Sequence, residues 1–356
     1  MSAKLEQIQG IRALAMLGIF LAHTTMWLPD SLSWFTPLVL RLGGSGVATF
    51  FIISGFLLAY RHKLVPTISK RNVIYDAWQK VSKMYVLYLI TIMVCLITQL
   101  PSSVYGWLVT SVYLIFHVTL TQDFIPFAAL INAFNAPAWF LSALFGIWIL
   151  IYLFPRSVNA MMELPAKKCI AALVALMAIQ IVWMLLVTYG ISPLMPKRYL
   201  AWCHRWLVYY NPIICLSEFS VGVLLGRYCA QRQLSVKMQN GIALGVLLVI
   251  IVYVSVSIRA LQVPSTLIMV IAECFVCFGI IAVMSSRSMG YRILSTRPLV
   301  WFGNISGYFF LIHTAVLFSM RVVTDYVSQP WLILISFILS TIMAEISDVL
   351  YMRKTR

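Results

Sequence analysis

Residues 84–100 read MYVLYLITIMVCLITQL, a run of 17 residues with no charged side chain. A helix needs about 20 apolar residues, with a range of roughly 17–25, to cross a hydrocarbon core about 30 Å thick. Backbone groups in lipid must be paired internally, so a spanning segment is either a helix or a strand of a closed barrel. Barrel strands alternate polar and apolar residues, whereas this run is solidly apolar. It therefore predicts a transmembrane helix.

Runs of this kind recur along the whole chain. Of its 356 residues, 62% are hydrophobic and 10% are charged, and its mean hydropathy is +0.94. A soluble domain usually carries about 25% charged residues, so lipid must cover much of this surface. We predict an all-α, polytopic transmembrane helix bundle with about 10 spans, forming one integral membrane domain over residues 1–356. The other nine spans cover roughly residues 8–26, 46–60, 138–154, 168–188, 212–228, 240–258, 265–285, 299–320 and 331–351.

A further apolar stretch, about 104–120, decides the orientation. If it does not cross, 19 lysines and arginines fall on one side of the membrane and six on the other, with Arg12 inside the first span. If it crosses as an eleventh span, residues 121–137, which contain no lysine or arginine, move to the basic side. Basic residues collect on the cytoplasmic side. We therefore expect a re-entrant or interfacial 104–120, and both termini on the cytoplasmic face of the plasma (inner) membrane.

The formal charge of +16 would suggest nucleic acid as the partner of a soluble protein. Here the basic residues are explained by topology, so we expect membrane lipid and no nucleic acid. Seven cysteines, mostly inside apolar runs, argue against a disulfide framework. Cys274 and Cys277 have the spacing of a metal or redox pair but lack a second pair, so we interpret them as packing residues and expect no metal. The first run lacks a clean cleavage site, and we interpret it as a retained span rather than a signal peptide.

Arg12 and His23 are ionisable residues in the first predicted span. Eleven positions make close to three helical turns, which places both side chains on one face, about 16 Å apart along the axis. An arginine can bind phosphate or a developing oxyanion, and a histidine can accept a proton from a hydroxyl group. The alternative is an arginine that reaches to the membrane surface and a histidine bonded to a neighbouring helix. The spacing alone leaves both interpretations open.

Two further features lie nearby. A loop with six basic residues precedes the span at 84–100, and it includes Arg71, Lys80 and Lys83. Such a loop usually reflects topology and anionic lipid; the alternative is an anion site, for example for the phosphates of an acyl carrier. The small residues Gly43-Gly44-Ser45-Gly46 allow close approach of helices and also suit a bend.

Several motifs together resemble the acyltransferase 3 family of integral membrane acyltransferases, which O-acetylate surface glycans. The family's arginine, ten residues and histidine match Arg12 and His23. The resemblance covers most of the chain, in the family's order. The other matching elements are Phe50 to Leu57, the basic pair Lys80 and Lys83, Pro137-Ala-Trp139-Phe-Leu, Glu218-Phe219 with Gly222, and Gly303 to His313.

The chain departs from the family pattern at three places. Lysines replace both arginines of the basic pair, which removes the bidentate fork. Val86 stands where the family usually has a proline, and the element at Trp139 carries no acid. These departures put the identity of the acyl donor and acceptor in doubt.

The resemblance implies acyl-CoA as a cytoplasmic co-substrate, and acetyl is the acyl group that members of the family most commonly transfer. The acceptor would be a hydroxyl group of an extracytoplasmic glycan or lipid-linked sugar. His23 would be the general base, Arg12 would position the donor or stabilise charge, and Lys80, Lys83 and Arg71 would bind the coenzyme A phosphates. Trp139 would stack on a sugar or the pantetheine arm, or belong to an interfacial tryptophan belt. Further substrate or structural candidates are Ser54, Glu218, Tyr308 and His313.

The rival function is a flippase or exporter of a lipid-linked glycan or small molecule. Such transporters show internal repeats or broken helices in matching halves, and the sequence shows neither. A scaffold without catalysis would not need Arg12 and His23 aligned. For the acceptor we can point only to two stretches, 121–137 and 189–211. Glu273, Glu345 and Asp348 are interpreted as helix-contact or interfacial groups.

Overall fold

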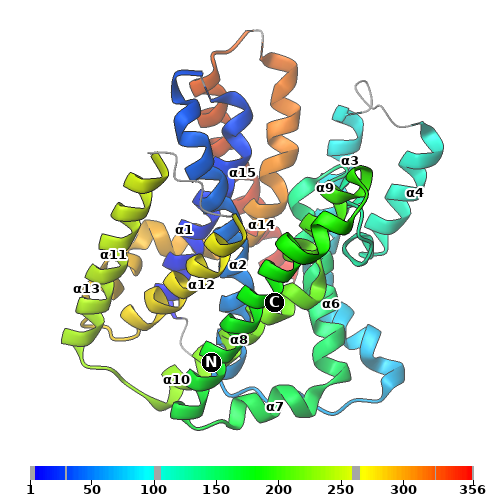
Figure 1. Cartoon of the computed structure of the whole chain (residues 1–356). Helices are drawn as coiled ribbons and strands as arrows, with labels where there is room; N and C mark the ends of the chain where they lie inside the picture. Colours follow the sequence, from blue (N-terminus) through cyan, green and yellow to red (C-terminus); the bar gives the residue numbers. More distant parts are fainter. Residues whose placement is uncertain (1–4, 29, 100–105, 259–264, 325, 355–356) are drawn as a thin grey trace. The chain divides into compact units, whose positions relative to one another are not determined.

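The computed structural model describes residues 5–28, 30–99, 106–258, 265–324 and 326–354. Every regular element in these ranges is a helix, so the all-α prediction is confirmed (Figure 1). Eight of the described helical stretches are long and apolar enough to cross a membrane, and residues 107–118, 236–250 and 270–282 form shorter apolar helices. A count of about ten crossings remains a prediction. Lys4, Arg259 and Arg356, which enter the charge count, and residues 104–105 lie outside the described ranges.

Seven of the predicted spans have both ends within three residues of the ends of an observed helix. The reason is that each is a mainly apolar run bounded by polar residues. These helices are α1 (Glu6–His23), α6 (Trp139–Leu153), α8 (Ala166–Leu185), α10 (Pro212–Gln231), α12 (Ser265–Ala282), α14 (Arg297–Met320) and α15 (Gln329–Lys354).

Two helices begin well before the predicted spans. Helix α2 (Thr36–Tyr60) starts at a proline-containing first turn, where proline is well tolerated. It runs through Gly43–Gly46 as one continuous helix. Helix α3 (Val73–Gln99) starts 11 residues before the apolar run, because its first turns are amphipathic. Lys80 and Lys83 therefore lie on a helix and not in the loop that the sequence predicted.

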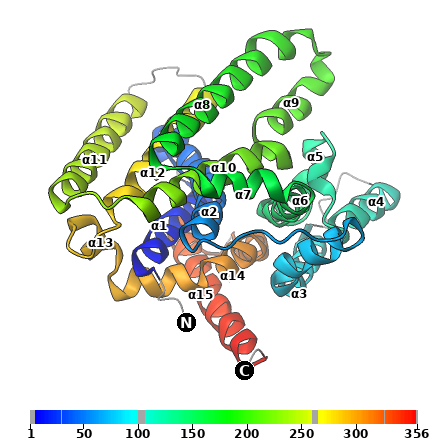
Figure 2. The same ribbon diagram turned by 90° about the horizontal axis from the view of Figure 1, so that it is seen from below.

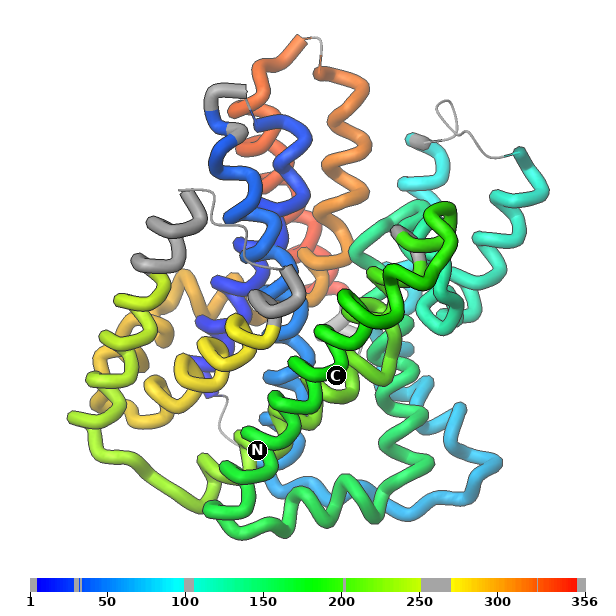
Figure 3. Tube along the Cα trace, viewed as in Figure 1, coloured from blue at the N-terminus to red at the C-terminus, as the bar shows by residue number. Residues whose placement is uncertain are grey.

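The chain divides into two compact units. The first contains residues 1–64, 156–184 and 217–306. Helices α1 and α2 run side by side in it, both drawn in blue (Figures 1 and 3). Its core includes Ile52 and Phe56 of α2, Val221 and Leu225 of α10, and Ile280 of α12. Its elements are α1 (Glu6–His23), α2, α7 (Pro155–Glu163), α8, most of α10, α11 (Val236–Ile258), α12 (Ser265–Ala282), α13 (Met289–Leu294) and the start of α14.

Glycines hold α1 against α2. A Cβ atom built on Gly46 would lie 2.6 Å from the carbonyl oxygen of Ala15, and one on Gly18 would lie 3.2 Å from that of Leu42. A Cβ on Gly43 would overlap the Cβ of Ala22. The small residues at 43–46 thus serve close helix approach.

Glycines also hold α2 against α10, and they come from two of the sequence motifs. A Cβ on Gly55 would overlap the carbonyl oxygen of Phe219, and a Cβ on Gly222 would overlap that of Ile52. The motif at Phe50 to Leu57 and the motif at Glu218 to Gly222 are therefore packing partners.

The second unit contains residues 65–155, 185–216 and 307–356. Helices α3 and α6 lie side by side in it (Figures 1 and 2). Residues 186–191 and 206–210 are π-helical turns that follow α8 and α9. Its other elements are α4 (Trp107–Val118), α5 (Ala128–Ile131), α9 (Lys197–Arg205), most of α14 and α15.

Helix α4 ends level with the middle of α3. The Tyr85 hydroxyl donates to the carbonyl oxygen of Val118 over 2.6 Å, and the Tyr88 hydroxyl donates to that of His117 over 2.8 Å. Twelve residues make a helix about 18 Å long, too short to cross the hydrocarbon core alone. Mostly irregular residues 119–138 then lead to α6. That the stretch 104–120 does not cross the membrane stays a prediction.

The packing of α10 on α2 gives a stability prediction. Gly222→Ala forces a methyl group onto a backbone oxygen that cannot move away, and overpacking of this kind costs about 1–3 kcal/mol or more. The temperature at which the detergent-solubilised protein loses its monodisperse size-exclusion peak should fall by several degrees. Gly245→Ala on α11, where a Cβ meets nothing within 4 Å, is the matched control and should be neutral. Equal stability of the two variants would contradict this packing.

Candidate active site

Arg12 and His23 lie on one unbroken helix, α1. Their Cα atoms are therefore about 16 Å apart along the axis. Arg12 is half-buried, its Nη1 donates to Gln9 Oε1 over 3.2 Å, and its guanidinium lies 5.7 Å from the centre of the Phe50 ring of α2. The two side chains share a helix, but they are too far apart to touch the same atom of a ligand.

His23 is the last residue of α1 and is half-buried. Its Nδ1 lies 2.8 Å from the carbonyl oxygen of Ile19. A carbonyl oxygen can only accept, so the neutral ring carries its proton on Nδ1 and its lone pair on Nε2. The helix backbone thus sets the tautomer that a general base needs.

Ser54 is occupied by its own helix. Its hydroxyl donates to the carbonyl oxygen of Phe50 over 2.7 Å, a bond typical of serine inside a helix. The geometry therefore gives Ser54 a structural role beside Phe50.

Glu218 belongs to a buried carboxyl pair in the first unit. Glu218 is 4% exposed and Glu273 of α12 is 1% exposed, and the two carboxyl groups lie close to each other. Glu273 is hydrogen-bonded to Gln180, whose Nε2 donates to Ser217 Oγ over 2.8 Å. The structure thus joins Glu273, which we interpreted as a helix-contact group, to a motif residue. The sequence showed that Glu218 and Glu273 lie inside predicted spans, but it did not show that the two are close together.

The three basic candidates lie in the second unit and are exposed. Arg71 is in a short 3₁₀ turn (Lys70–Asn72), and Lys80 and Lys83 follow on α3. Lys80 and Lys83 are three residues apart and so lie on one helix face. Lys80 Nζ lies 4.8 Å from the centre of the Trp148 ring of α6, a cation–π geometry. These cations remain accessible to an anionic ligand.

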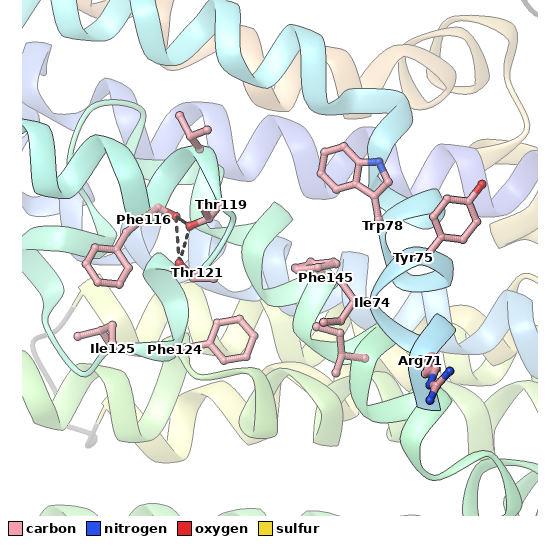
Figure 4. A pocket seen from close by; sticks show the side chains of 12 residues that line it. Arg71, Ile74, Tyr75, Trp78, Phe116, Thr119, Thr121, Phe124, Ile125 and Phe145 are labelled. Carbon is pink, nitrogen blue, oxygen red and sulfur yellow. Dashed lines mark hydrogen bonds between the residues drawn. The ribbon is translucent and has the colours of Figure 1, made fainter. Parts of the chain in front are cut away.

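A pocket of about 970 Å³ opens beside Arg71 (Figure 4). The guanidinium of Arg71 is a cation in an otherwise mainly apolar and aromatic wall. At the opposite wall, Thr119 and Thr121 hydroxyls lie 2.7 Å apart and both bond the carbonyl oxygen of Phe116. The pocket suits a ligand with an apolar body and an anionic end. Its remaining lining is Ile74, Tyr75, Trp78, Val118, Phe124, Ile125, Phe145 and Ile149.

The other aromatic candidates of the second unit are built into its interior. Trp139 is 4% exposed, with edge-on ring contacts to Tyr209 and Tyr210 at 5.1 and 5.0 Å between ring centres. His313 is fully buried; its Nδ1 bonds the carbonyl oxygen of Phe309 over 3.1 Å, and its Nε2 bonds Thr314 Oγ1 over 3.2 Å. Tyr308 is half-buried. Both nitrogens of His313 are thus satisfied by its own helix.

The predicted residues divide between the units. Arg12, His23, Ser54 and Glu218 fall in the first, and Arg71, Lys80, Lys83, Trp139, Tyr308 and His313 fall in the second. The described residues contain no group of three or more histidine, cysteine, aspartate or glutamate side chains that could hold a metal ion. The seven cysteines are free. The pocket residues on α4 and α6 were not foreseen, because their contacts depend on where α4 ends.

The sequence motifs and the comparison with known proteins point to the same family. The sequence model of a family described as "Acyltransferase domain" matches residues 5–346. A relative from Streptomyces mycarofaciens, named Acyltransferase MdmB, is 25% identical over 241 residues. The match covers 62% of this chain and 57% of the relative's length. No solved structure matches the chain. The chain belongs to the acyltransferase 3 family and is an integral membrane protein.

Proposed function

We propose that the protein transfers an acyl group, most simply acetyl, from cytoplasmic acyl-CoA to a hydroxyl group of an extracytoplasmic glycan or lipid-linked sugar. The family supports acyl transfer, and the name of the relative is that of an acyltransferase. The observation that carries the catalytic assignment is the bond from His23 Nδ1 to the Ile19 carbonyl oxygen. In the neutral ring with this tautomer, the lone pair is on Nε2, the atom that we assign to accept the hydroxyl proton.

The proposed step is balanced without any further reactant. The acceptor oxygen bonds to the thioester carbonyl carbon while His23 Nε2 takes the hydroxyl proton. The carbon–sulfur bond then breaks, and the proton passes to the departing thiolate, giving an ester and free coenzyme A. A general base of this kind typically contributes 10²–10⁴-fold. Arg12, about 16 Å from His23 along α1, would hold a part of the donor remote from the reacting carbon.

The basic residues of the second unit would bind the phosphates of the donor. Arg71, Lys80 and Lys83 are exposed cations suited to the phosphates of coenzyme A. The apolar pocket beside Arg71 has the lining that a pantetheine arm and acyl group need. An anionic lipid head group would be bound by the same cations. Donor binding at these residues therefore has to be compared with lipid binding.

One observation favours the transporter as the second candidate. Helix α4 and α6 are separated by the mostly irregular segment 119–138, and transporters often place such interruptions at their substrate sites. A flippase would move the glycan without consuming acyl-CoA. Consumption of the thioester therefore separates the two functions.

The first test measures transfer of label from radiolabelled acetyl-CoA in membranes that contain the protein. Wild type should label a glycan or lipid, and His23→Gln at equal abundance should lose about 10²–10⁴-fold of the rate because the base is gone. The matched control is His62→Asn, which removes an exposed histidine while tolerating its left-handed backbone (φ 48°).

Undiminished labelling by His23→Gln would remove His23 from the mechanism and leave an acyltransferase. If wild type consumes no acyl-CoA with several donors and host glycans, the transporter becomes the better account.

The second test concerns donor binding. Lys80→Ala and Lys83→Ala should each raise KM for acyl-CoA about two- to fivefold with little change in kcat, as loss of an exposed charge contact does. High salt should reduce the difference in KM between each variant and wild type. Arginine at either position should restore binding, since it keeps the charge and adds a fork for phosphate.

Lys63→Ala, at an exposed lysine in the loop that precedes α3, is the control and should change neither constant. A similar rise in KM for Lys63→Ala would show a general surface effect and no donor site.

A further inference from the structure

The segment 119–138 and the end of α4 carry most of the unpaired polar groups of the second unit. Among the described residues, 11 buried side-chain atoms have no hydrogen-bond partner, and five of them belong to residues 117–135. These five are His117 Nε2, Gln122 Oε1, both carboxyl oxygens of Asp123, and Asn135 Oδ1. All four side chains are 0% exposed.

The segment is held at the level of the middle of α3 and α14. Asn135 Nδ2 donates to Thr91 Oγ1 over 2.9 Å and to the carbonyl oxygen of Leu311 over 2.8 Å. Gln122 Nε2 donates to the Tyr88 hydroxyl over 3.2 Å. At such depth, irregular backbone is tolerated where it is buried in protein or lines a cavity, and unpaired polar groups cost several kcal/mol each. A bound ligand that forms hydrogen bonds with these unpaired groups would remove this cost.

Asp123 has the largest unmet hydrogen-bonding capacity of these residues, because neither of its carboxyl oxygens has a hydrogen-bond partner that holds the segment. Its backbone does that instead: the amide donates to Ser142 Oγ over 3.4 Å, and its carbonyl oxygen accepts from Trp206 Nε1 over 2.8 Å. Ser142 in turn donates to the carbonyl oxygen of Leu120 over 2.9 Å. The backbone is thus fixed and the carboxyl group is left with up to four unused acceptor positions.

The π-helical turn Trp206–Tyr210 packs on this segment and adds the groups of a sugar site. The Tyr210 hydroxyl donates to Asn132 Oδ1 over 3.0 Å. Trp139 contacts the rings of Tyr209 and Tyr210. Asn132 and Tyr209 are half-buried and so lie nearer the surface than Asp123. π-Helical turns of this kind occur frequently at functional sites.

We infer that residues 119–138 and 205–210 form the binding site for the sugar ring of the acceptor, with the Asp123 carboxyl group pairing ring hydroxyls. A carboxyl and two amides offer hydrogen bonds to hydroxyl groups, and the half-buried rings of Trp206 and Tyr209 offer apolar surface to a ring. A single acid gives too few ligands for a metal ion. The exposed Arg205, whose guanidinium lies 5.3 Å from the centre of the Tyr210 ring, disfavours a cationic ligand. That the bound sugar is the acyl acceptor rests on the proposed function; the sugar site itself does not.

Cys203 provides a readout of binding that does not depend on catalysis. Its half-buried thiol lies 3.7 Å from the carbonyl oxygen of Pro126, so it reports on the contact between the two segments. A bound sugar should slow its reaction with a maleimide, about tenfold at ten times Kd. Labelling of Cys203 is followed by mass spectrometry of the peptide, so the other cysteines do not interfere.

The probes are octyl glucoside, galactoside, mannoside and rhamnoside below their micelle concentrations, with octane-1,2-diol as the control that has the tail but no ring. At least one glycoside should protect Cys203 in wild type. Asp123→Asn should raise the glycoside concentration that gives half-maximal protection of Cys203 about tenfold or more. The reason is that the sugar hydroxyls lose their hydrogen bonds to the carboxyl group. Its Cys203 should react normally without glycoside. Asp76→Asn, a half-buried acid on α3, is the matched control and should behave as wild type.

The inference is overturned if no glycoside protects better than octane-1,2-diol, or if Asp123→Asn is protected as well as wild type. Protection that depends on Asp123 in a protein that consumes no acyl-CoA would support the sugar site while contradicting the proposed acyl transfer. Acyl transfer to glycan with no Asp123-dependent protection would uphold the function and remove this site.

Discussion

The close contact of α2 with α1 and α10 is the constraint on which the first unit depends. In lipid, helices gain little from burying apolar side chains against one another, so association relies on packing and on interhelical hydrogen bonds. Here glycines allow backbones to touch: Gly46 meets Ala15, and Gly222 meets Ile52. This contact places Phe50 beside the Arg12 guanidinium and fixes the helix that carries His23. The same residues therefore determine the helix packing and the position of the proposed catalytic residues.

The second unit shows the other consequence of a lipid solvent. A polar group that water cannot reach must form its hydrogen bonds within the protein or with a bound ligand. His313 and Asn135 meet this requirement in different ways: both nitrogens of His313 are bonded within its helix, whereas Asn135 spans α3 and α14 through its amide nitrogen and leaves Oδ1 open. Asp123 leaves both oxygens open. The distinction between satisfied and open polar groups separates structural candidates from binding candidates more sharply than residue type does.

Much of the fold was predictable from hydropathy, because α6, α10, α14 and α15 are apolar runs with polar ends. That residues 104–120 do not cross the membrane stays a prediction from charge, since a full crossing would move basic residues to the opposite side. The early starts of α2 and α3 were missed because their first turns mix polar and apolar residues, and this error placed Lys80 and Lys83 in a loop. Arg12 and His23 were proposed from helical periodicity within one span, and the structure places both on α1; their role in the site stays a prediction.

The remainder of the candidate site depends on contacts between distant segments. Trp206 lies 83 residues from Asp123, whose carbonyl oxygen it bonds, and no periodic pattern links the two. The sequence could point to 121–137 and 189–211 only as stretches. The pairing of Glu218 with Glu273 is hidden for the same reason. A turn such as Trp206–Tyr210, which departs from the α-helix, leaves no mark in hydropathy.

The most direct test of the account is a structure of the protein with a non-hydrolysable acyl-coenzyme A analogue, in which a methylene group replaces the thioester sulfur. We predict phosphate density at Arg71, Lys80 and Lys83. The acyl carbonyl carbon should lie where a hydroxyl oxygen about 3–3.5 Å from it can also reach His23 Nε2 at about 2.6–3.2 Å. An analogue bound with its acyl carbon beyond the reach of His23, or with its phosphates away from these cations, would contradict the account.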